Sequence, residues 1–344
     1  MMLGAPWDHA LAGRIETALV ESVALAANPL GDPTRRPVLV QLPPGYDDEP
    51  ERRYRSIYIL QGYGGMLTDW GRRGLLQPTT PELVDNAFVT GAAPPSVVVW
   101  VDAWTRLGGS QFLDSAGTGR YQSYLCEDVV AFVDTTYRTV AHRNARAVLG
   151  LSSGGYGAAM AAMARPDVFG AFGSHAGDGA FEVSLVGDIA RAYALLRDRY
   201  DRDPDAFARF LAAPGAALAG DEFPLLMTYC LAACYSPGPD GRPELPVDPA
   251  SGAWRAEIWD RWLALDPVRV APAHLDALSS MRAAWIDAGC EDEYHLDLAA
   301  ERLAAVVRAA GTPVHHELFS GTHRHLSRRY PLSLAYLAAA LTTD

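Results

Sequence analysis

Short apolar runs alternate along the chain with stretches whose apolar positions recur at helical spacing. The runs are rich in β-forming residues and predict strands at 14–24, 36–42, 56–61, 96–101, 146–149, 169–174, 281–288 and 314–319. Helical spacing predicts helices at 121–136 and about 295–310, and a last helix that ends near Leu341. Because several strands are apolar throughout, we expect an α/β fold with a mainly parallel central sheet covered by helices on both faces.

The pattern changes between about residues 180 and 275, where helical stretches and loops occur without a clear strand. Trp254, Ile258 and Trp262 recur there at helical spacing, which is more typical of a packed core than of a substrate contact. We therefore expect residues 1–179 and 276–344 to form one α/β core. Residues 180–275 would form a largely helical insertion, before the strand at 281–288, that acts as a lid or wall over the functional site.

Composition restricts the partners of the protein. The 344 residues include 29 basic and 41 acidic side chains, which gives a net charge of −12. Nucleic acids and anionic membrane surfaces attract patches of basic residues, so we expect neither as the main partner. The N-terminal segment lacks the pattern of a secretory signal, and no run of about 18 apolar residues predicts a membrane span. We expect a cytoplasmic protein, with an oligomeric state that the sequence does not indicate.

Cysteine usage predicts neither a disulfide scaffold nor a metal site. Four cysteines are too few to form a disulfide scaffold in a chain of this length. Cys230 and Cys234 lie in an apolar run that we expect to be helical, and we expect both to be small buried side chains. Further metal ligands are not evident near them, so we expect no metal and no cofactor.

The strongest motif lies where the strand at 146–149 gives way to an Ala- and Met-rich helix. Ser152 stands between Gly150 and Gly154 in the G-x-S-x-G spacing. At a strand-to-helix junction this spacing is typical of the nucleophile turn of α/β-hydrolases, in which small neighbours let strand and helix pass closely. The helix N-terminus favours negative charge that develops beside the serine. We therefore predict that Ser152 is a nucleophile.

A serine nucleophile needs a base, and the base needs an acid that orients it. In α/β-hydrolases the acid and the base follow the serine in that order, after late strands of the sheet. The strand at 281–288 opens into Gly289-Cys290-Glu291-Asp292-Glu293. Among these acids we prefer Asp292, with Glu291 second; Asp287 lies just upstream.

The base is sought after the next strand, at 314–319. His323 follows this strand directly, after Gly-Thr, whereas His325 lies two residues further on. His315 and His316 lie within the strand and are expected to be ordinary sheet residues. We predict His323 as the base in preference to His325.

Two backbone N–H groups must stabilise the oxyanion that forms in acyl transfer. We expect one from Ser153, which follows the nucleophile, and the other from Tyr63 in the glycine-rich stretch after the strand at 56–61. For the substrate pocket the loops near the site offer two aromatic residues and two glycines of that stretch: Trp70, Trp104, Gly62 and Gly64.

Taken together, these motifs resemble the Putative esterase family of α/β-hydrolases, which includes esterase D (S-formylglutathione hydrolase), enterochelin esterase, feruloyl esterases and mycolyltransferases. The resemblance covers nearly all of the chain outside the insertion. It rests on residues 43–46, 58–65, 121–137, 150–158, 165–170, 289–292 and 321–323. It implies the same nucleophile, acid, base and oxyanion pair: Ser152, Asp292, His323, and Tyr63 with Ser153.

The chain departs from the family at two positions. The family often has His or Asp in place of Gln61, and Met in place of Ser153, where only the backbone N–H is used. We expect a serine esterase that cleaves a small-molecule carboxylic ester through an acyl-enzyme. A thioesterase of the S-formylglutathione type, an acyltransferase or a peptidase would use the same residues, and an inactive binding module is the alternative of a different class. The sequence does not indicate the natural ester or whether the insertion moves.

Overall fold

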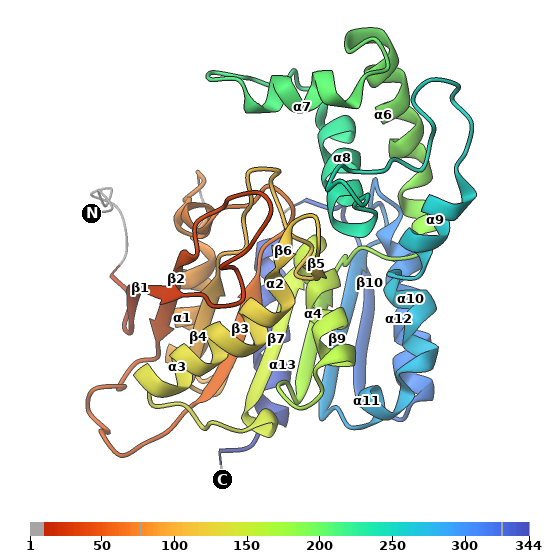
Figure 1. The fold of residues 1–344 in the computed structure, drawn as a ribbon. Helices are drawn as coiled ribbons and strands as arrows, with labels where there is room; N and C mark the ends of the chain where they lie inside the picture. The colour runs from red at the N-terminus through yellow and green to blue at the C-terminus, as the bar shows by residue number, and fades with distance from the viewer. Residues whose placement is uncertain (1–9, 76, 325, 344) are drawn as a thin grey trace.

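The computed structural model describes residues 10–75, 77–324 and 326–343. An eight-stranded sheet runs through the molecule in the order β1-β2-β4-β3-β7-β8-β9-β10 (Figure 1). Strand β2 pairs antiparallel with β1 and β4, and every other pair is parallel. The strands are β1 (Arg14–Glu21), β2 (Arg35–Leu42), β3 (Arg55–Leu60), β4 (Ser96–Val101), β7 (Arg146–Leu151), β8 (Ala171–His175), β9 (Ala283–Gly289) and β10 (Val314–Phe319). The mainly parallel sheet predicted from the apolar runs is confirmed.

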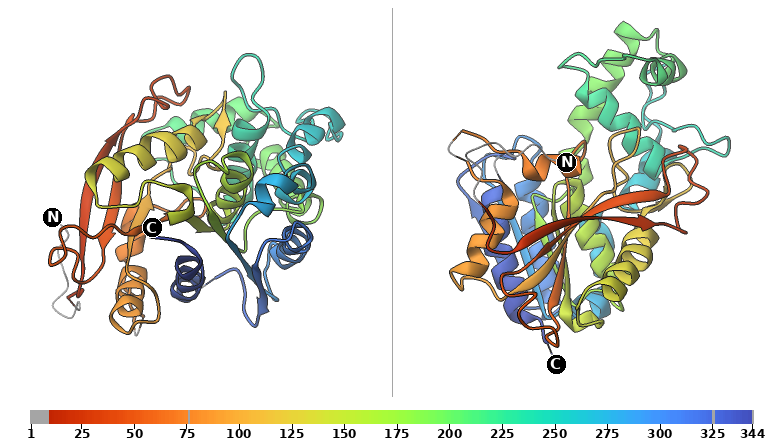
Figure 2. Two further views of the ribbon diagram at one scale, coloured as in Figure 1. Left: turned by 90° about the horizontal axis from the view of Figure 1, so that it is seen from below. Right: turned by 90° about the vertical axis from the view of Figure 1, so that its left-hand side faces the viewer.

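Helices cover both faces of the sheet (Figure 2). One buried cluster joins the sheet to α3 (Val130–Thr136), α4 (Ser153–Ala164) and α12 (Leu296–Ala309). A second cluster packs α1 (Thr80–Val89) and α13 (Tyr330–Ala340) on the other face. The helix predicted at 121–136 consists of α2 (Tyr121–Ser123), one π-helical turn (Tyr124–Val129) and α3. A small hairpin, β5 (Asp114–Ser115) with β6 (Gly119–Arg120), precedes it.

Residues 181–279 contain helices and no strand, in agreement with the pattern of the sequence. Their helices are α5 (Phe181–Ser184), α6 (Val186–Arg199), α7 (Pro204–Ala212), α8 (Phe223–Tyr235), α9 (Ala256–Leu263), α10 (Pro267–Val270) and α11 (Leu275–Ser279). Figure 1 shows α6, α7 and α8 above the sheet, and we call residues 181–265 the cap. The hydrophobic cluster of the cap, with Phe207 and Trp262 fully buried, extends to Tyr156 of α4 in the core. Ile258 is buried with them, whereas Trp254 is 43% exposed and packs on Trp259.

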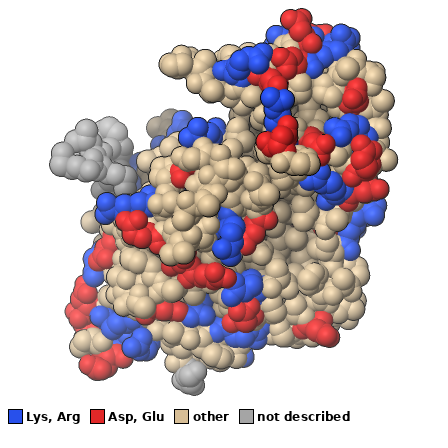
Figure 3. Space-filling view, viewed as in Figure 1, with Lys and Arg blue, Asp and Glu red and all other residues tan. Residues whose placement is uncertain are grey.

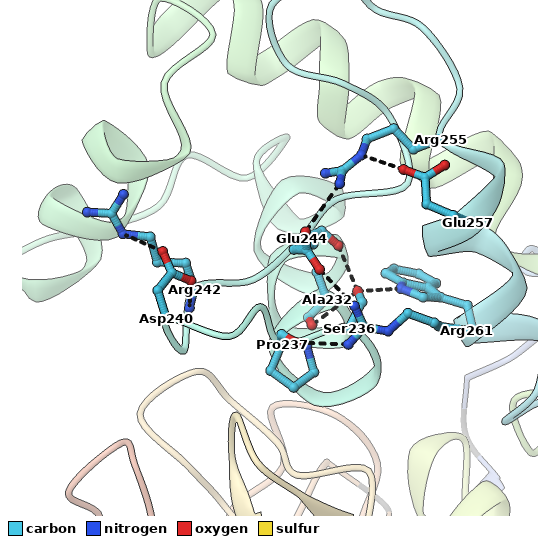
Figure 4. Close-up of polar contacts among 10 residues, drawn as sticks. Ala232, Ser236, Pro237, Asp240, Arg242, Glu244, Arg255, Glu257 and Arg261 are labelled. Atoms are coloured by element: carbon cyan, nitrogen blue, oxygen red, sulfur yellow. Dashed lines mark hydrogen bonds and ion pairs between the residues drawn. The ribbon is translucent and has the colours of Figure 1, made fainter.

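Polar contacts fix the long loop of the cap between α8 and α9 (Figure 4). The Ser236 hydroxyl accepts a hydrogen bond from Trp262 Nε1 at 2.8 Å and donates one to the Glu244 carbonyl at 2.7 Å. The Glu244 carboxylate pairs with Arg255 and Arg261. Because these bonds join the loop to α9, the cap holds its shape without a strand.

Acidic and basic side chains are interleaved on the face of the molecule that Figure 3 shows. The basic ones are all arginine, because the sequence contains no lysine. Among the helices of the described ranges, none is long and apolar enough to cross a membrane.

A buried hydrogen-bond network joins β8, β9 and α13 below the carboxyl ends of the strands. His175 lies 2.6 Å from Asp287 through Nδ1 and 2.8 Å from the Ser333 hydroxyl through Nε2, and all three side chains are 0% exposed. Asp287 also accepts hydrogen bonds from Trp285 Nε1 and Arg329 Nε. These side chains have no access to solvent, so the network supports the sheet rather than binding a substrate.

Asp287 is expected to make the fold sensitive to acid. Burial alone would raise the pKa of Asp287, but the charge and hydrogen bond of His175, with Trp285 and Arg329, lower it. A carboxyl whose pKa is lowered by folding stabilises the protein above the unfolded pKa of about 3.9, and this contribution is lost as the pH falls through the lower folded value. Asp287→Asn should therefore cost about 3–5 kcal/mol of unfolding free energy at pH 7. Denaturant unfolding from pH 3 to 7 checks this; a difference that does not shrink on acidification would contradict it.

Candidate active site

The turn between β7 and α4 holds Ser152 in a conformation that few L-residues adopt, with φ 57° and ψ −123°. The flanking glycines are needed because the chain passes so close to itself. A Cβ on Gly154 would lie 2.4 Å from the Leu60 carbonyl oxygen, and one on Gly150 would lie 2.5 Å from the Gly154 carbonyl carbon. The sharp turn expected from the G-x-S-x-G spacing is present, and Ser152 stands at the N-terminus of α4.

The structure brings Asp292 and His323 together. His323 Nδ1 lies 2.8 Å from Asp292 Oδ2, and Asp292 Oδ1 accepts a hydrogen bond from the Tyr294 N–H at 2.9 Å. Asp292 is only 4% exposed, whereas Glu291 and Glu293 on either side face solvent. The Glu293 carboxylate accepts a hydrogen bond from the His323 N–H at 2.9 Å, which holds the loop that carries this histidine.

The other histidines considered for the base lie elsewhere. His315 and His316 belong to β10, and the His315 ring stacks on Trp285 with centroids 3.8 Å apart. Burial lowers the pKa of His316. His325 lies outside the described residues.

Ser152 and His323 line one cavity of about 220 Å³. Since His323 Nδ1 faces Asp292, Nε2 is the ring nitrogen that remains for a reacting group. Within the described part of the chain, no hydrogen bond joins Ser152 to His323; the Ser152 hydroxyl bonds instead to Asp178 Oδ1 at 3.4 Å. Bonds between a nucleophile and its base are often loose before a substrate is bound. The remaining lining is mostly apolar: Gly62, Tyr63, Leu151, Ser184, Leu185, Phe223, Met227, Tyr294 and Leu296.

The loop after β3 lies against the serine. A Cβ on Gly62 would lie 3.4 Å from Ser152 Cβ, so a larger residue there would contact Ser152 directly. The Tyr63 hydroxyl donates to the Leu107 carbonyl at 2.7 Å, which anchors this loop. No hydrogen bond among the described residues uses the N–H of Tyr63 or Ser153. Both groups are therefore available as donors.

Of the four residues predicted for the substrate pocket, only Gly62 lines the cavity. Trp70 packs on Trp100 and Tyr330, with ring centroids 4.7 and 5.5 Å apart, and borders a separate hollow. Trp104 likewise borders other hollows. The Gly64 N–H donates to a carbonyl of a neighbouring loop. The structure does not bring these three residues into the cavity with Ser152.

Sequence reasoning missed Asp178, which follows β8 in the loop His175-Ala176-Gly177-Asp178. Burial raises the pKa of Asp178 to about 6, against the lowering effects of His323 and of the bond from Ser152, while Asp292 adds to the increase. The signal in the sequence was a carboxylate just after β8, the strand next to the one that leads to Ser152. The pattern also did not reveal which cap residues reach the cavity: Ser184, Leu185, Phe223 and Met227.

No group of three or more His, Cys, Asp or Glu side chains among the described residues is arranged to hold a metal ion. Cys230 and Cys234 are buried and unbridged in α8, and each thiol lies 3.4 Å from a backbone carbonyl. Burial raises their pKa values. These thiols are therefore unreactive core side chains.

Comparisons with known proteins find relatives in sequence and in fold. An endo-1,4-beta-xylanase/feruloyl esterase of Xylanibacter ruminicola is 27% identical over 140 residues, which are 39% of this chain and 18% of that protein. A ferulic acid esterase structure covers 98% of this chain and 100% of its own, with a TM-score of 0.58 and 18% identity. An S-formylglutathione hydrolase of Agrobacterium tumefaciens gives 0.58 and 14%, with 97% and 98% covered.

The strand order, the helices on both faces and these structural neighbours define an α/β-hydrolase fold. Within this fold the model of the Putative esterase family matches residues 33–328, and the chain belongs to that family. The chain spans only 18% of the length of the xylanase/feruloyl esterase that it matches.

Proposed function

We propose that this protein is a serine esterase that hydrolyses carboxylic esters through Ser152, His323 and Asp292. The observation that carries the proposal is the shared cavity, which is lined both by Ser152 at a strained turn and by a histidine held by a buried carboxylate. Membership of the Putative esterase family supports an ester as the substrate. The esterase names of the relatives favour the same reaction.

In the proposed reaction His323 Nε2 takes the Ser152 proton while Oγ forms a bond to the ester carbonyl carbon. The N–H groups of Tyr63 and Ser153 stabilise the negative oxygen. His323 then gives the proton to the departing alkoxide as the carbonyl–oxygen bond breaks, which leaves an acyl-enzyme. Water, deprotonated by His323, releases the acid and restores Ser152. Asp292 keeps the proton of His323 on Nδ1 throughout.

The cavity favours a small acyl group. Its volume of about 220 Å³ is below the roughly 300–1,000 Å³ typical of sites for drug-sized ligands. Leu185 and Met227 of the cap and Leu151 and Leu296 of the core supply apolar walls. Burial of an apolar acyl chain against these walls would contribute binding energy of about 25 cal/mol per Å².

A fluorophosphonate probe tests the proposal directly. Its phosphorus forms a bond to an activated serine oxygen with loss of fluoride, so we expect one labelled peptide, containing Ser152. Competition by short-chain phenyl esters should slow labelling, and Ser152→Ala should abolish it. Labelling at another residue, or none in a folded protein that is pure and active on esters, would refute the assignment. Initial rates with acetyl esters and acetyl thioesters, run side by side, separate an esterase from a thioesterase.

A further inference from the structure

Asp178 is a carboxylate in the cavity that the proposed mechanism does not use. It is the only acidic side chain among the described residues that line this cavity, and it is 8% exposed. Its one hydrogen bond to a described residue comes from Ser152, through Oδ1. The carboxylate thus points toward the place where the acyl group must sit.

The loop that carries Asp178 is tightly fixed. Ala176 adopts φ 42° and donates its N–H to the Asp287 carbonyl at 2.7 Å. A Cβ on Gly177 would lie 2.2 Å from the Ser174 hydroxyl oxygen, so this stretch packs directly on β8. On the far side, the Ala180 and Phe181 N–H groups donate to the Asp266 carboxylate at 3.1 and 2.9 Å. The position of Asp178 therefore does not depend on an adaptable surface loop.

A negative charge at this place opposes the attack on a plain ester. The carbonyl oxygen becomes an anion during attack, and a carboxylate next to Ser152 in an apolar cavity repels it. The charge is useful only when the substrate brings a hydrogen-bond donor or a cation to pair with it. The α-carbon of an acyl group is attached to the carbonyl carbon that Ser152 attacks, so a donor on this carbon lies within reach of Asp178.

We infer that Asp178 is a specificity-determining residue, and that the cavity selects acyl groups that carry a hydroxyl or ammonium group on the α-carbon. This inference rests on the proposed function. The shared chemistry is a donor facing a carboxylate, and the apolar walls would accept the rest of a short acyl chain.

The ionisation of Asp178 agrees with this role. Burial raises its pKa to about 6, and the charged or titratable groups that act on it are His323 and Asp292, with the Ser152 hydroxyl bonded to it. Below pH 6 the carboxyl is protonated and pairs poorly with an ammonium group; above pH 6 it is ionised and pairs well. Preference for an ammonium-bearing acyl group should therefore increase between pH 5 and 7.

Three substrates with the same leaving group test the inference: the phenyl esters of propanoate, of 2-hydroxypropanoate and of alanine. The rate with each ester is corrected for its spontaneous hydrolysis. We expect the wild type to prefer the 2-hydroxy or alanyl ester in kcat/KM. Asp178→Asn should reduce the preference for the alanyl ester over the propanoyl ester at least tenfold at pH 7 and remove the increase that ionisation of Asp178 causes between pH 5 and 7. The contribution of His323 cancels in this ratio because all three esters react through it. The hydroxy and alanyl arms show which donor the site prefers.

Asp188→Asn is the matched control, because it removes an aspartate of the nearby helix α6 that does not line the cavity. It should leave the ratio unchanged. An unchanged ratio in Asp178→Asn, or an equal fall in Asp188→Asn, would overturn the inference. If Asp178→Asn does not fold, Asp178→Ala tests the same ratio. Ser152→Ala distinguishes failure of this inference from failure of the proposed function. If Ser152→Ala loses activity on all three esters but Asp178→Asn keeps the wild-type preference, the esterase proposal stands and only this inference fails.

Discussion

Replacing Ser152 by alanine is expected to lower kcat for ester hydrolysis by about 10⁴- to 10⁶-fold, as loss of a serine nucleophile does when it acts together with a histidine. The variant should remain folded, because the Ser152 hydroxyl that it lacks makes only a long hydrogen bond to Asp178. Alanine also tolerates the strained turn no worse than serine does. Steady-state rates with a short phenyl ester, together with thermal unfolding, check both parts.

The buried network provides a sharp control for this experiment. Ser333, His175 and Asp287 are joined by hydrogen bonds in the same order as a nucleophile, base and acid, but none of them reaches a cavity. Ser333→Ala should leave the turnover of folded molecules unchanged and lower stability by about 1–3 kcal/mol, because His175 Nε2 loses its partner. Loss of turnover in Ser333→Ala with retention in Ser152→Ala would mean that the wrong serine has been assigned.

Asp292→Asn is expected to reduce kcat by about 10⁴-fold, since an amide in place of the carboxylate favours the wrong tautomer of a catalytic histidine. The carboxylate lies 2.8 Å from His323 Nδ1 and is buried, so water cannot replace it. The measurement is kcat with a phenyl ester from pH 6 to 9.

Glu291→Gln is the natural control for Asp292→Asn, because it is adjacent, exposed and was the second choice for the acid from sequence. Its activity should stay within a few-fold of the wild type. A large loss in Glu291→Gln and a small one in Asp292→Asn would reverse the assignment of the acid.

Most of the sheet could be predicted from sequence because its strands are buried on both faces and appear as unbroken apolar runs. The runs at 56–61 and 96–101 correspond to β3 and β4 within one residue. The edge strand β1 ends at Glu21, before the expected residue 24, because the apolar pattern continues into a turn that the hydrogen bond from Ser22 to Thr34 closes. Helix α1 was not predicted, because it follows a loop and its sequence is only weakly amphipathic.

The candidate site was predictable to the extent that backbone position decides it. Ser152, Asp292 and His323 follow strand ends, and neighbouring strand ends meet at one edge of the sheet. The direction of a side chain within a loop is not encoded in this way. Trp70 was expected at the cavity but packs beside Trp100, while Asp178, with no motif around it, accepts a hydrogen bond from Ser152.

The cavity is built from two parts of the chain, the sheet with its loops and the cap. Ser152, Asp292 and His323 follow strands of the sheet, whereas Leu185, Phe223 and Met227 belong to the cap. Substitutions at these three positions of the cap would change the apolar walls of the cavity and leave Ser152, Asp292 and His323 unaltered. A library of variants confined to these three positions would therefore sample new acyl preferences while the proposed catalytic residues stay the same.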